Sequence, residues 1–338
     1  MPVEVRPFDP VSAPEAELVA SYAVMSAVQS LDHPEQKLPT LEQYIELISA
    51  PTSLAGPMRR WLALEDSRVV GHASAIYPEH ENRHMTIVRI VVTPERRRRG
   101  VGTALLRAIL PDLGADGRTV VAGHGVKADA SGEQWARALG FVRTHGFIRQ
   151  ILKVADVDQA LWQHPVADGF RLERWIGAAP ETCLAAYARA RTAIADAPSG
   201  ESTMAHRDWT PERVRVQEET MRAGNWGNRV VVAVHEASGE VAAITELSVR
   251  AEQPTRAFQG DTAVVAEFRG RGLGLAVKGA MLRWLTADRP EVEHVHTQTA
   301  HDNVHMARIN FAVGFTTDAA LSELEADLGD LVKRLAAE

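Results

Sequence analysis

The feature that most constrains this fold is a repeat spanning half of the 338-residue chain. The segment RRRGVG at 97–102 recurs as RGRGLG at 269–274, an offset of 172 residues. A Gly-Phe pair at 140–141 returns at 314–315, an offset of 174 residues. Landmarks that keep their order and separation indicate duplicated structure, so the sequence predicts two copies of one domain.

Each copy has the element order of an α+β domain. Periodicity and turn signals predict two helices, several antiparallel strands, then helix, strand, helix and strand. Because this order lacks alternating strand–helix units, we expect one mixed, mostly antiparallel sheet flanked by helices in each copy. The residues around 154–169 are the expected joint, and we place the two domains at 1–160 and 166–338.

Composition limits the class of protein. Hydrophobic residues make up 45% and charged residues 24% of the chain, as in globular proteins with sizeable cores. The net charge of −7 argues against a general nucleic-acid binder, because phosphate attraction dominates that affinity. The single cysteine, Cys183, cannot form an intramolecular disulfide, so we expect a reducing, cytoplasmic location. No apolar run is long enough for a signal peptide or a spanning helix, and we expect no membrane association.

Each recurring segment predicts a phosphate-binding loop. The segment follows a valine-containing strand and precedes a helix, so unpaired N–H groups gather at the positive end of the helix dipole. Glycine there permits close approach of phosphate oxygens and positive φ angles. A dinucleotide fingerprint is excluded because Leu275 occupies its third glycine position, and a Walker loop because Val277 precedes Lys278.

The spacing Arg-x-x-Gly-x-Gly, present in both copies with a Gly-Phe pair further on, resembles the GNAT acyltransferase superfamily. The resemblance covers roughly 66–154 and 237–324. It implies that the diphosphate of an acyl-coenzyme A binds the loop N–H groups, with the pantetheine between the preceding strand and the next. The alternative for the arginines at 96–99 is a solvated basic turn. The implied N-terminal site consists of Val91, Val92, Arg97, Arg98, Gly100, Val101 and Gly102. The implied C-terminal site consists of Val264, Val265, Arg269, Gly270, Arg271, Gly272, Leu273, Gly274 and Asn303.

The C-terminal copy is the richer in polar residues after its predicted strand at 294–297. Its segment 297–315 resembles tandem actinobacterial GNAT proteins, a group that includes mycothiol synthase-like proteins, whereas the matching segment 129–141 offers fewer candidates. We therefore predict a catalytic C-terminal copy and a structural or ligand-binding N-terminal copy. The implied activity is N-acyl transfer, most simply of acetyl from acetyl-coenzyme A as co-substrate to a small-molecule amine by direct attack.

Attack by an amine requires removal of a proton, because an alkylamine is mostly protonated at neutral pH. The candidate bases are Glu246 and Asp261, and the alternative for each is a solvated or ion-paired carboxylate. Many members of the superfamily place a tyrosine acid on the last helix, but Asn310 occupies that position here and Ala136 in the first copy. Asn310 is then a candidate for a hydrogen bond to the coenzyme or substrate. Asn303 has two interpretations, a pantetheine contact or a helix cap.

Two classes of function stay open on the sequence. One is the coenzyme A-dependent N-acyltransferase, and the other is a non-catalytic acyl-coenzyme A-binding or regulatory protein. No metal is expected, because His301 and His305 lack an indicated third ligand. We expect a small-molecule amine as partner, with neither nucleic acid nor a membrane, and the chain as a monomer or a homodimer.

Overall fold

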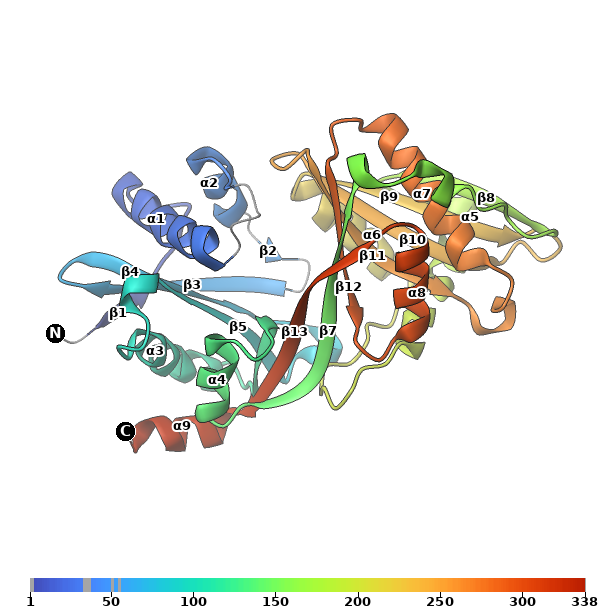
Figure 1. The fold of residues 1–338 in the computed structure, drawn as a ribbon. Helices are drawn as coiled ribbons and strands as arrows, with labels where there is room; N and C mark the ends of the chain where they lie inside the picture. Colours follow the sequence, from blue (N-terminus) through green and yellow to red (C-terminus); the bar gives the residue numbers. More distant parts are fainter. Residues whose placement is uncertain (1–2, 33–37, 50–51, 54–55, 338) are drawn as a thin grey trace. The chain divides into compact units, whose positions relative to one another are not determined.

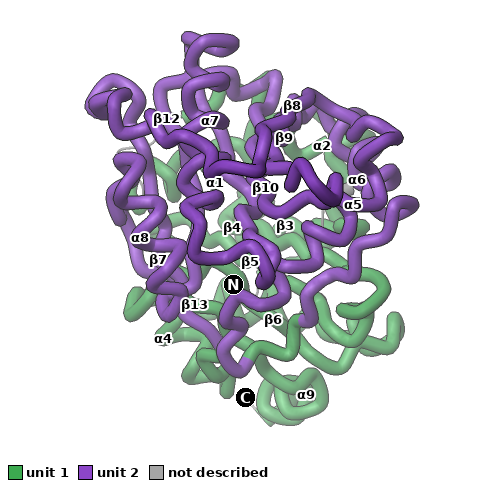
Figure 2. Tube along the Cα trace, turned by 90° about the vertical axis from the view of Figure 1, so that its right-hand side faces the viewer, with its two compact units in different colours: residues 1–144, 202–204, 322–338 green, residues 145–201, 205–321 purple. Residues whose placement is uncertain are grey.

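The computed structural model describes residues 3–32, 38–49, 52–53 and 56–337. They form two compact units, neither of which is contiguous in the sequence (Figure 2). Unit 1 consists of residues 1–144, 202–204 and 322–338, and unit 2 of residues 145–201 and 205–321.

Unit 1 is a mixed sheet with helices on both faces. Its strands lie in the order β1, β3, β4, β5, β6, and the end of β13 follows β6. The β5–β6 pair is parallel, whereas the pairs β1–β3, β3–β4 and β4–β5 are antiparallel, and the short β2 pairs with β3. The strands are β1 (Glu4–Pro7), β2 (Thr52–Ser53), β3 (Gly56–Glu65), β4 (Arg68–Ile76), β5 (Met85–Val92) and β6 (Val120–Lys127). The helices are α1 (Glu15–Asp32), α2 (Leu41–Ser49), α3 (Val101–Ala115), α4 (Ser131–Ala138) and α9 (Leu328–Ala336).

Alternation along the strands of unit 1 decides which side chains meet which helices. Leu62 and Leu64 of β3 pack with Leu18 of α1 on one face of the sheet. Ala63, between them, packs on the other face in the cluster that holds Ile109 of α3. The unit therefore has one core under α1 and α2 and a second under α3, α4 and α9 (Figure 1).

Unit 2 repeats this plan. Its strands lie in the order β7, β12, β11, β10, β9, β8; β11 and β12 are parallel, and the other pairs are antiparallel. Helices α5 and α6 pack on one face of the sheet and α7 on the other. The strands are β7 (Val142–Lys153), β8 (Phe170–Ile176), β9 (Trp226–His235), β10 (Val241–Arg250), β11 (Arg256–Val264), β12 (His294–Ala300) and β13 (Thr316–Asp327). The helices are α5 (Glu181–Thr192), α6 (Pro211–Ala223), α7 (Leu273–Asp288) and α8 (Val304–Ala312).

The two halves of the chain exchange their last strands. From residue 145 onward β7 belongs to unit 2, where it pairs with β12 from Phe147↔Ala300 to Lys153↔His294. The end of β13 and all of α9 belong to unit 1, where the N–H of Leu328 donates to the carbonyl oxygen of Thr119 at 2.8 Å. The compact units therefore differ from the expected domains, 1–160 and 166–338, because strand partners far apart in the chain determine them.

The expected fold class, an α+β domain with a mixed, mostly antiparallel sheet flanked by helices, is confirmed in both units. Strands β1 and β8 and helix α9 were not expected. The expected joint is an ordered part of unit 2, since Trp162 is fully buried and its Nε1 donates to the carbonyl oxygen of Val313 at 2.9 Å. Among the helices in the described ranges, none combines the length and apolar character needed to cross a membrane.

Gly279 of α7 is required by its packing against the joint. A Cβ at this position would lie 2.4 Å from the carbonyl oxygen of Trp162. We predict that Gly279→Ala lowers the free energy of unfolding by about 1–3 kcal/mol, the usual effect of overpacking. Gly114→Ala in α3 is the matched control, because its Cβ would meet Leu328 at 3.9 Å and alanine stabilises a helix interior by about 0.5–1 kcal/mol. Urea unfolding measures both variants, and equal stabilities would contradict the prediction.

Candidate functional site

Both glycine-rich segments form a left-handed turn that starts a helix. Gly100 (φ 82°) and Gly272 (φ 74°) directly precede α3 and α7, and no described side chain caps either helix. Two residues earlier in each loop, Arg98 (φ 61°) and Gly270 (φ 77°) share the left-handed conformation. The first-turn N–H groups of α3 and α7 therefore lie at an uncapped helix N-terminus, the arrangement that binds phosphate.

In each unit, the strand before the loop separates from its parallel neighbour. β5 pairs with β6 as far as Ile87 and continues to Val92. β11 pairs with β12 as far as Phe258 and continues to Val264. Diverging strands leave backbone amide groups unpaired, so the gap suits the amides of an extended pantetheine. The expected strand residues lie along or just after this diverging part: Val91, Val92, Val264 and Val265.

The first arginine of each loop is held by an aspartate. Arg97 donates to both carboxylate oxygens of Asp32, at 3.0 and 2.6 Å. Arg269 forms the corresponding ion pair with Asp196. The Nε of each arginine also donates to the carbonyl oxygen of the last residue of the preceding strand, at 3.3 Å in unit 1 and 3.0 Å in unit 2. These guanidinium groups tie the loop to the strand and to the last residue of α1 in unit 1 or to the short helical turn after α5 in unit 2. Their contact with a coenzyme stays a prediction.

The other loop positions divide into exposed charges and core residues. Arg98 and Arg271 are exposed. Val101 and Leu273, the first residues of α3 and α7, are buried in the two cores, so they offer a ligand their backbone N–H groups alone.

The last glycine of each loop lies inside the helix, against the next helix along the chain. A Cβ on Gly274 would lie 3.0 Å from Cδ1 of Ile309 in α8, tighter than ordinary van der Waals contact. A Cβ on Gly102 would meet Trp135 of α4 at 3.6 Å. Glycine at position 274 therefore serves helix packing as well as the predicted loop.

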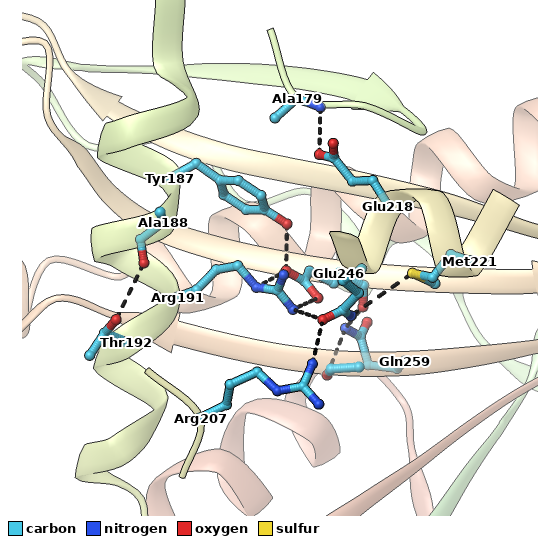
Figure 3. A network of polar contacts seen from close by, with 12 residues as sticks. Ala179, Tyr187, Ala188, Arg191, Thr192, Arg207, Glu218, Met221, Glu246 and Gln259 are labelled. Atoms are coloured by element: carbon cyan, nitrogen blue, oxygen red, sulfur yellow. Dashed lines mark hydrogen bonds and ion pairs between the residues drawn. The ribbon is translucent and has the colours of Figure 1, made fainter. Parts of the chain in front are cut away.

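Glu246 lies at the centre of a buried polar cluster in unit 2 (Figure 3). Tyr187 Oη donates to its Oε1 at 2.5 Å, and Arg191 NH2 donates to its Oε2 at 3.1 Å. Both partners come from α5, which packs on the sheet face that Glu246 occupies. Burial raises the pKa of the Glu246 carboxyl, and the charge of Arg191 opposes that rise. The guanidinium of Arg191 also stacks on Trp209, 3.3 Å from the ring centroid.

Asp261, the second predicted base, lies beside this cluster with its carboxylate free. It is half-buried and accepts no hydrogen bond from any described residue. Burial raises the pKa of Asp261, while the charges of Arg191 and His206 oppose that rise. The charge of Asp261 in turn raises the pKa of Glu246. The structure therefore brings the two predicted carboxylates together, one fully paired and the other available.

Asn310, the third predicted catalytic residue, belongs to a second buried network of unit 2. Its Nδ2 donates to Gln150 Oε1 at 2.7 Å and to Thr299 Oγ1 at 3.0 Å. Its Oδ1 accepts from the ammonium group of Lys278. Lys278 is fully buried without a carboxylate partner among the described residues, and burial lowers its pKa to about 7. A contact between Asn310 and a ligand stays a prediction.

Asn303 caps helix α8. Its Oδ1 accepts from the N–H of Met306 at 3.0 Å, so the capping interpretation is observed. The pantetheine contact stays a prediction. Within the described parts of the chain, no three His, Cys, Asp or Glu side chains are grouped as metal ligands.

Comparisons with known proteins agree with this geometry. Residues 24–144 match the model of the Acetyltransferase (GNAT) family. Over 97% of its length, the chain resembles the tandem GNAT protein from the clavulanic acid biosynthesis pathway, with a TM-score of 0.79, 23% identity and 99% of that protein covered. The chain therefore has the tandem GNAT fold. The resemblance drawn from its two loops is thereby confirmed.

Other proteins similar to this chain carry related names. Mycothiol acetyltransferase from Nocardia farcinica is 31% identical over 146 residues, which are 43% of this chain and 44% of that protein. The match thus spans less than half the length of that relative. A GCN5-related N-acetyltransferase from Sphaerobacter thermophilus has the same fold, with a TM-score of 0.70, 16% identity and 96% of each chain covered.

Sequence reasoning missed the partners that surround the predicted carboxylates and amide. Tyr187 and Arg191 lie on α5. The sequence of this helix predicts a buried face, but it does not show which residues that face contacts. Gln150 comes from a strand of the other half of the chain, so no local signal reveals it. Lys278 carries a signal that could have been used, because a lysine in the apolar stripe of α7, next to Val277, must be buried.

Lys278 should make the stability of the protein depend on pH. A folded-state pKa of about 7, below the ordinary 10.5, means that protonation opposes folding. The stability associated with this group is present above about pH 10.5 and is lost as the pH falls through about 7. We predict that wild type loses about 2–4 kcal/mol relative to Lys278→Met between pH 10 and pH 7. Urea unfolding across this range measures the difference, with Lys153→Met, an exposed lysine of β7, as the control; parallel profiles of wild type and Lys278→Met would contradict it.

Proposed function

We propose that this tandem GNAT protein is a coenzyme A-dependent N-acyltransferase that moves an acetyl group to a small-molecule amine, with catalysis in unit 2. The observation that carries the proposal is the free carboxylate of Asp261 on β11, the strand that diverges from β12. The family match and the two uncapped helix N-termini support coenzyme binding. The names of the relatives support acetyl as the transferred group.

Asp261 acts as the base in this proposal. Its ionised carboxylate first takes a proton from the bound ammonium group, and the neutral amine nitrogen then attacks the carbonyl carbon of the thioester. The new C–N bond forms, the C–S bond breaks, and the leaving sulfur takes the second proton from the nitrogen, so that coenzyme A departs as the thiol. A raised pKa suits a base that receives a proton near neutral pH. Glu246 is a positioning residue, because its carboxylate holds Arg191, whose charge acts on Asp261.

Catalysis is assigned to unit 2 because unit 1 has no carboxylate at the corresponding positions. Val92 pairs with Gly71 just as Val264 pairs with Ala243, so the strand registers of the two units can be compared directly. Counting along both strands from these pairs, Asp261 corresponds to Arg89 and Glu246 to Ser74. The unpaired carboxylate of Asp261 near the diverging strands suits an acceptor that arrives as a cationic amine.

Replacing Asp261 tests the enzyme proposal. We predict that Asp261→Asn lowers kcat for thiol release from acetyl-coenzyme A by about 10²- to 10⁴-fold, the usual contribution of a base. Wild-type activity should rise with pH through the raised pKa of Asp261, because the ionised form alone accepts a proton. Glu236→Gln, in the exposed turn after β9, is the matched control.

The assay uses a panel of amino sugars, polyamines and amino acids as acceptors. Undiminished turnover in Asp261→Asn would refute the role of this residue. If no amine of a broad panel releases thiol while the coenzyme still binds, the alternative function, a non-catalytic acyl-coenzyme A-binding protein, replaces the enzyme proposal.

The glycine turns test the binding of the coenzyme. A valine at φ 74° is strained, so Gly272→Val should disturb the turn that presents the N–H groups of α7. We predict that Gly272→Val and Gly100→Val each remove one of two acetyl-coenzyme A sites. Of the two variants, only Gly272→Val should abolish turnover, because catalysis is assigned to unit 2. Gly239→Val is the matched control, because Gly239 also has a φ of 74° and open space around it, but lies in the β9–β10 turn. Isothermal titration calorimetry counts the sites, and unchanged stoichiometry in both loop variants would contradict the prediction.

A further inference from the structure

A row of cationic side chains crosses one face of the sheet in unit 1. Arg60 of β3 pairs with Ser74 of β4, and Ser74 pairs with Arg89 of β5. Directly paired residues on adjacent strands point to the same face of a sheet. This is the face that α1 and α2 cover, because Leu62, two residues after Arg60, packs there with Leu18.

The cations of this row have no partner among the described residues. Neither Arg60 nor Arg89 forms a hydrogen bond or ion pair through its guanidinium group. His72, two residues before Ser74 on β4, lies on the same face, and its Nδ1 is shielded from solvent without a hydrogen-bond partner. Desolvation, with the charges of Arg89 and Arg60, lowers the pKa of His72 to about 4. Asp9 is the carboxylate whose charge acts on Arg60, and it is itself held by Ser12.

The corresponding row in unit 2 has the opposite charge. Glu246 pairs there with Val230 of β9 and lies beside Asp261 of β11. The row Arg-Ser-Arg of unit 1 thus stands where unit 2 has Val-Glu-Asp, two positive charges in place of two negative ones. Because the two units share one fold, the difference marks a different ligand and not a different scaffold. A cationic amine that suits unit 2 would be repelled in unit 1.

We propose that this face of unit 1 binds a small anionic molecule through a carboxylate or phosphate group, held by Arg60 and Arg89 with His72 and Ser74 beside them. Guanidinium groups match both anions, because they present paired N–H donors to two oxygens at once. A ligand anion would also give both guanidinium groups the ion pair that no described residue forms with them. The site needs neither acetyl-coenzyme A nor Asp261, so it stands apart from the function proposed for unit 2.

The test follows the imidazole signal of His72 in the full-length protein by NMR. Inorganic phosphate and succinate are titrated separately, and His72→Gln identifies the signal. We expect a saturable shift with at least one anion. Arg89→Gln should raise the dissociation constant by about 10- to 100-fold, the effect of losing a hydrogen bond between charged groups. Arg137→Gln removes an exposed arginine of α4, which packs on the opposite face, and should leave the constant unchanged.

The outcomes separate the possible ligands and the two proposals. A response to phosphate alone identifies a phosphoryl ligand, and a response to succinate alone a carboxylate; either supports the site. Arg60→Gln should also raise the dissociation constant measured from the His72 signal. This second variant shows that a weaker affinity in Arg89→Gln does not come from a folding defect of that variant. No saturable shift with either anion, or equal constants in wild type and both arginine variants, overturns the proposal. Loss of turnover in Asp261→Asn bears on unit 2 alone, so failure of one proposal leaves the other intact.

Discussion

The divergence of two parallel strands is the constraint on which each unit depends. A parallel pair that stops early leaves backbone amides without strand partners, and these must be satisfied by another group. In both units the longer strand is followed by a left-handed turn and an uncapped helix. The unpaired backbone amides of the strand and the unpaired N–H groups of the first helical turn therefore follow one another along the backbone. The Arg97–Asp32 and Arg269–Asp196 ion pairs hold in place the loop between the strand and the helix. The geometry proposed to bind the coenzyme is therefore a property of the backbone, maintained by side chains.

On this shared backbone, the two units differ in the chemistry of their interiors. Lys278 lies six residues after Gly272, where unit 1 has Leu106 six residues after Gly100. Asn310 lies four residues before the Gly-Phe pair, where unit 1 has Ala136. Leu106 and Ala136 belong to an apolar core, whereas their counterparts join a buried polar network. Buried polar groups are unfavourable unless they are bonded, and the Nε2 of Gln150 is the one buried side-chain nitrogen of this network without a partner among the described residues.

The predictable part of the fold is the part that short segments encode. A glycine-rich segment, the apolar stripe of the helix that follows it and a Gly-Phe pair are local sequence signals. They indicated the duplicated loops and the fold class. The catalytic candidates were predicted by residue type and strand position, and the structure shows that Glu246 and Asp261 do lie together. The sequence could not predict which of the two carboxylates is ion-paired, because the partner of Glu246 is Arg191, 55 residues earlier in the chain. The loop arginines gave no sign of aspartate partners 65 and 73 residues away.

The sequence by itself determined that this chain has two copies of one α+β domain and a glycine turn before a helix in each. Tertiary structure alone decided which strand completes which sheet, because a strand carries no local mark of its partner and pairing depends on the register of the whole sheet. It also decided which of the two carboxylates is ion-paired and which arginines form no ion pair with a described residue. Those outcomes follow from the docking of α1, α2 and α5 on the sheet, and the long-range contacts that dock a helix are not encoded in any one segment.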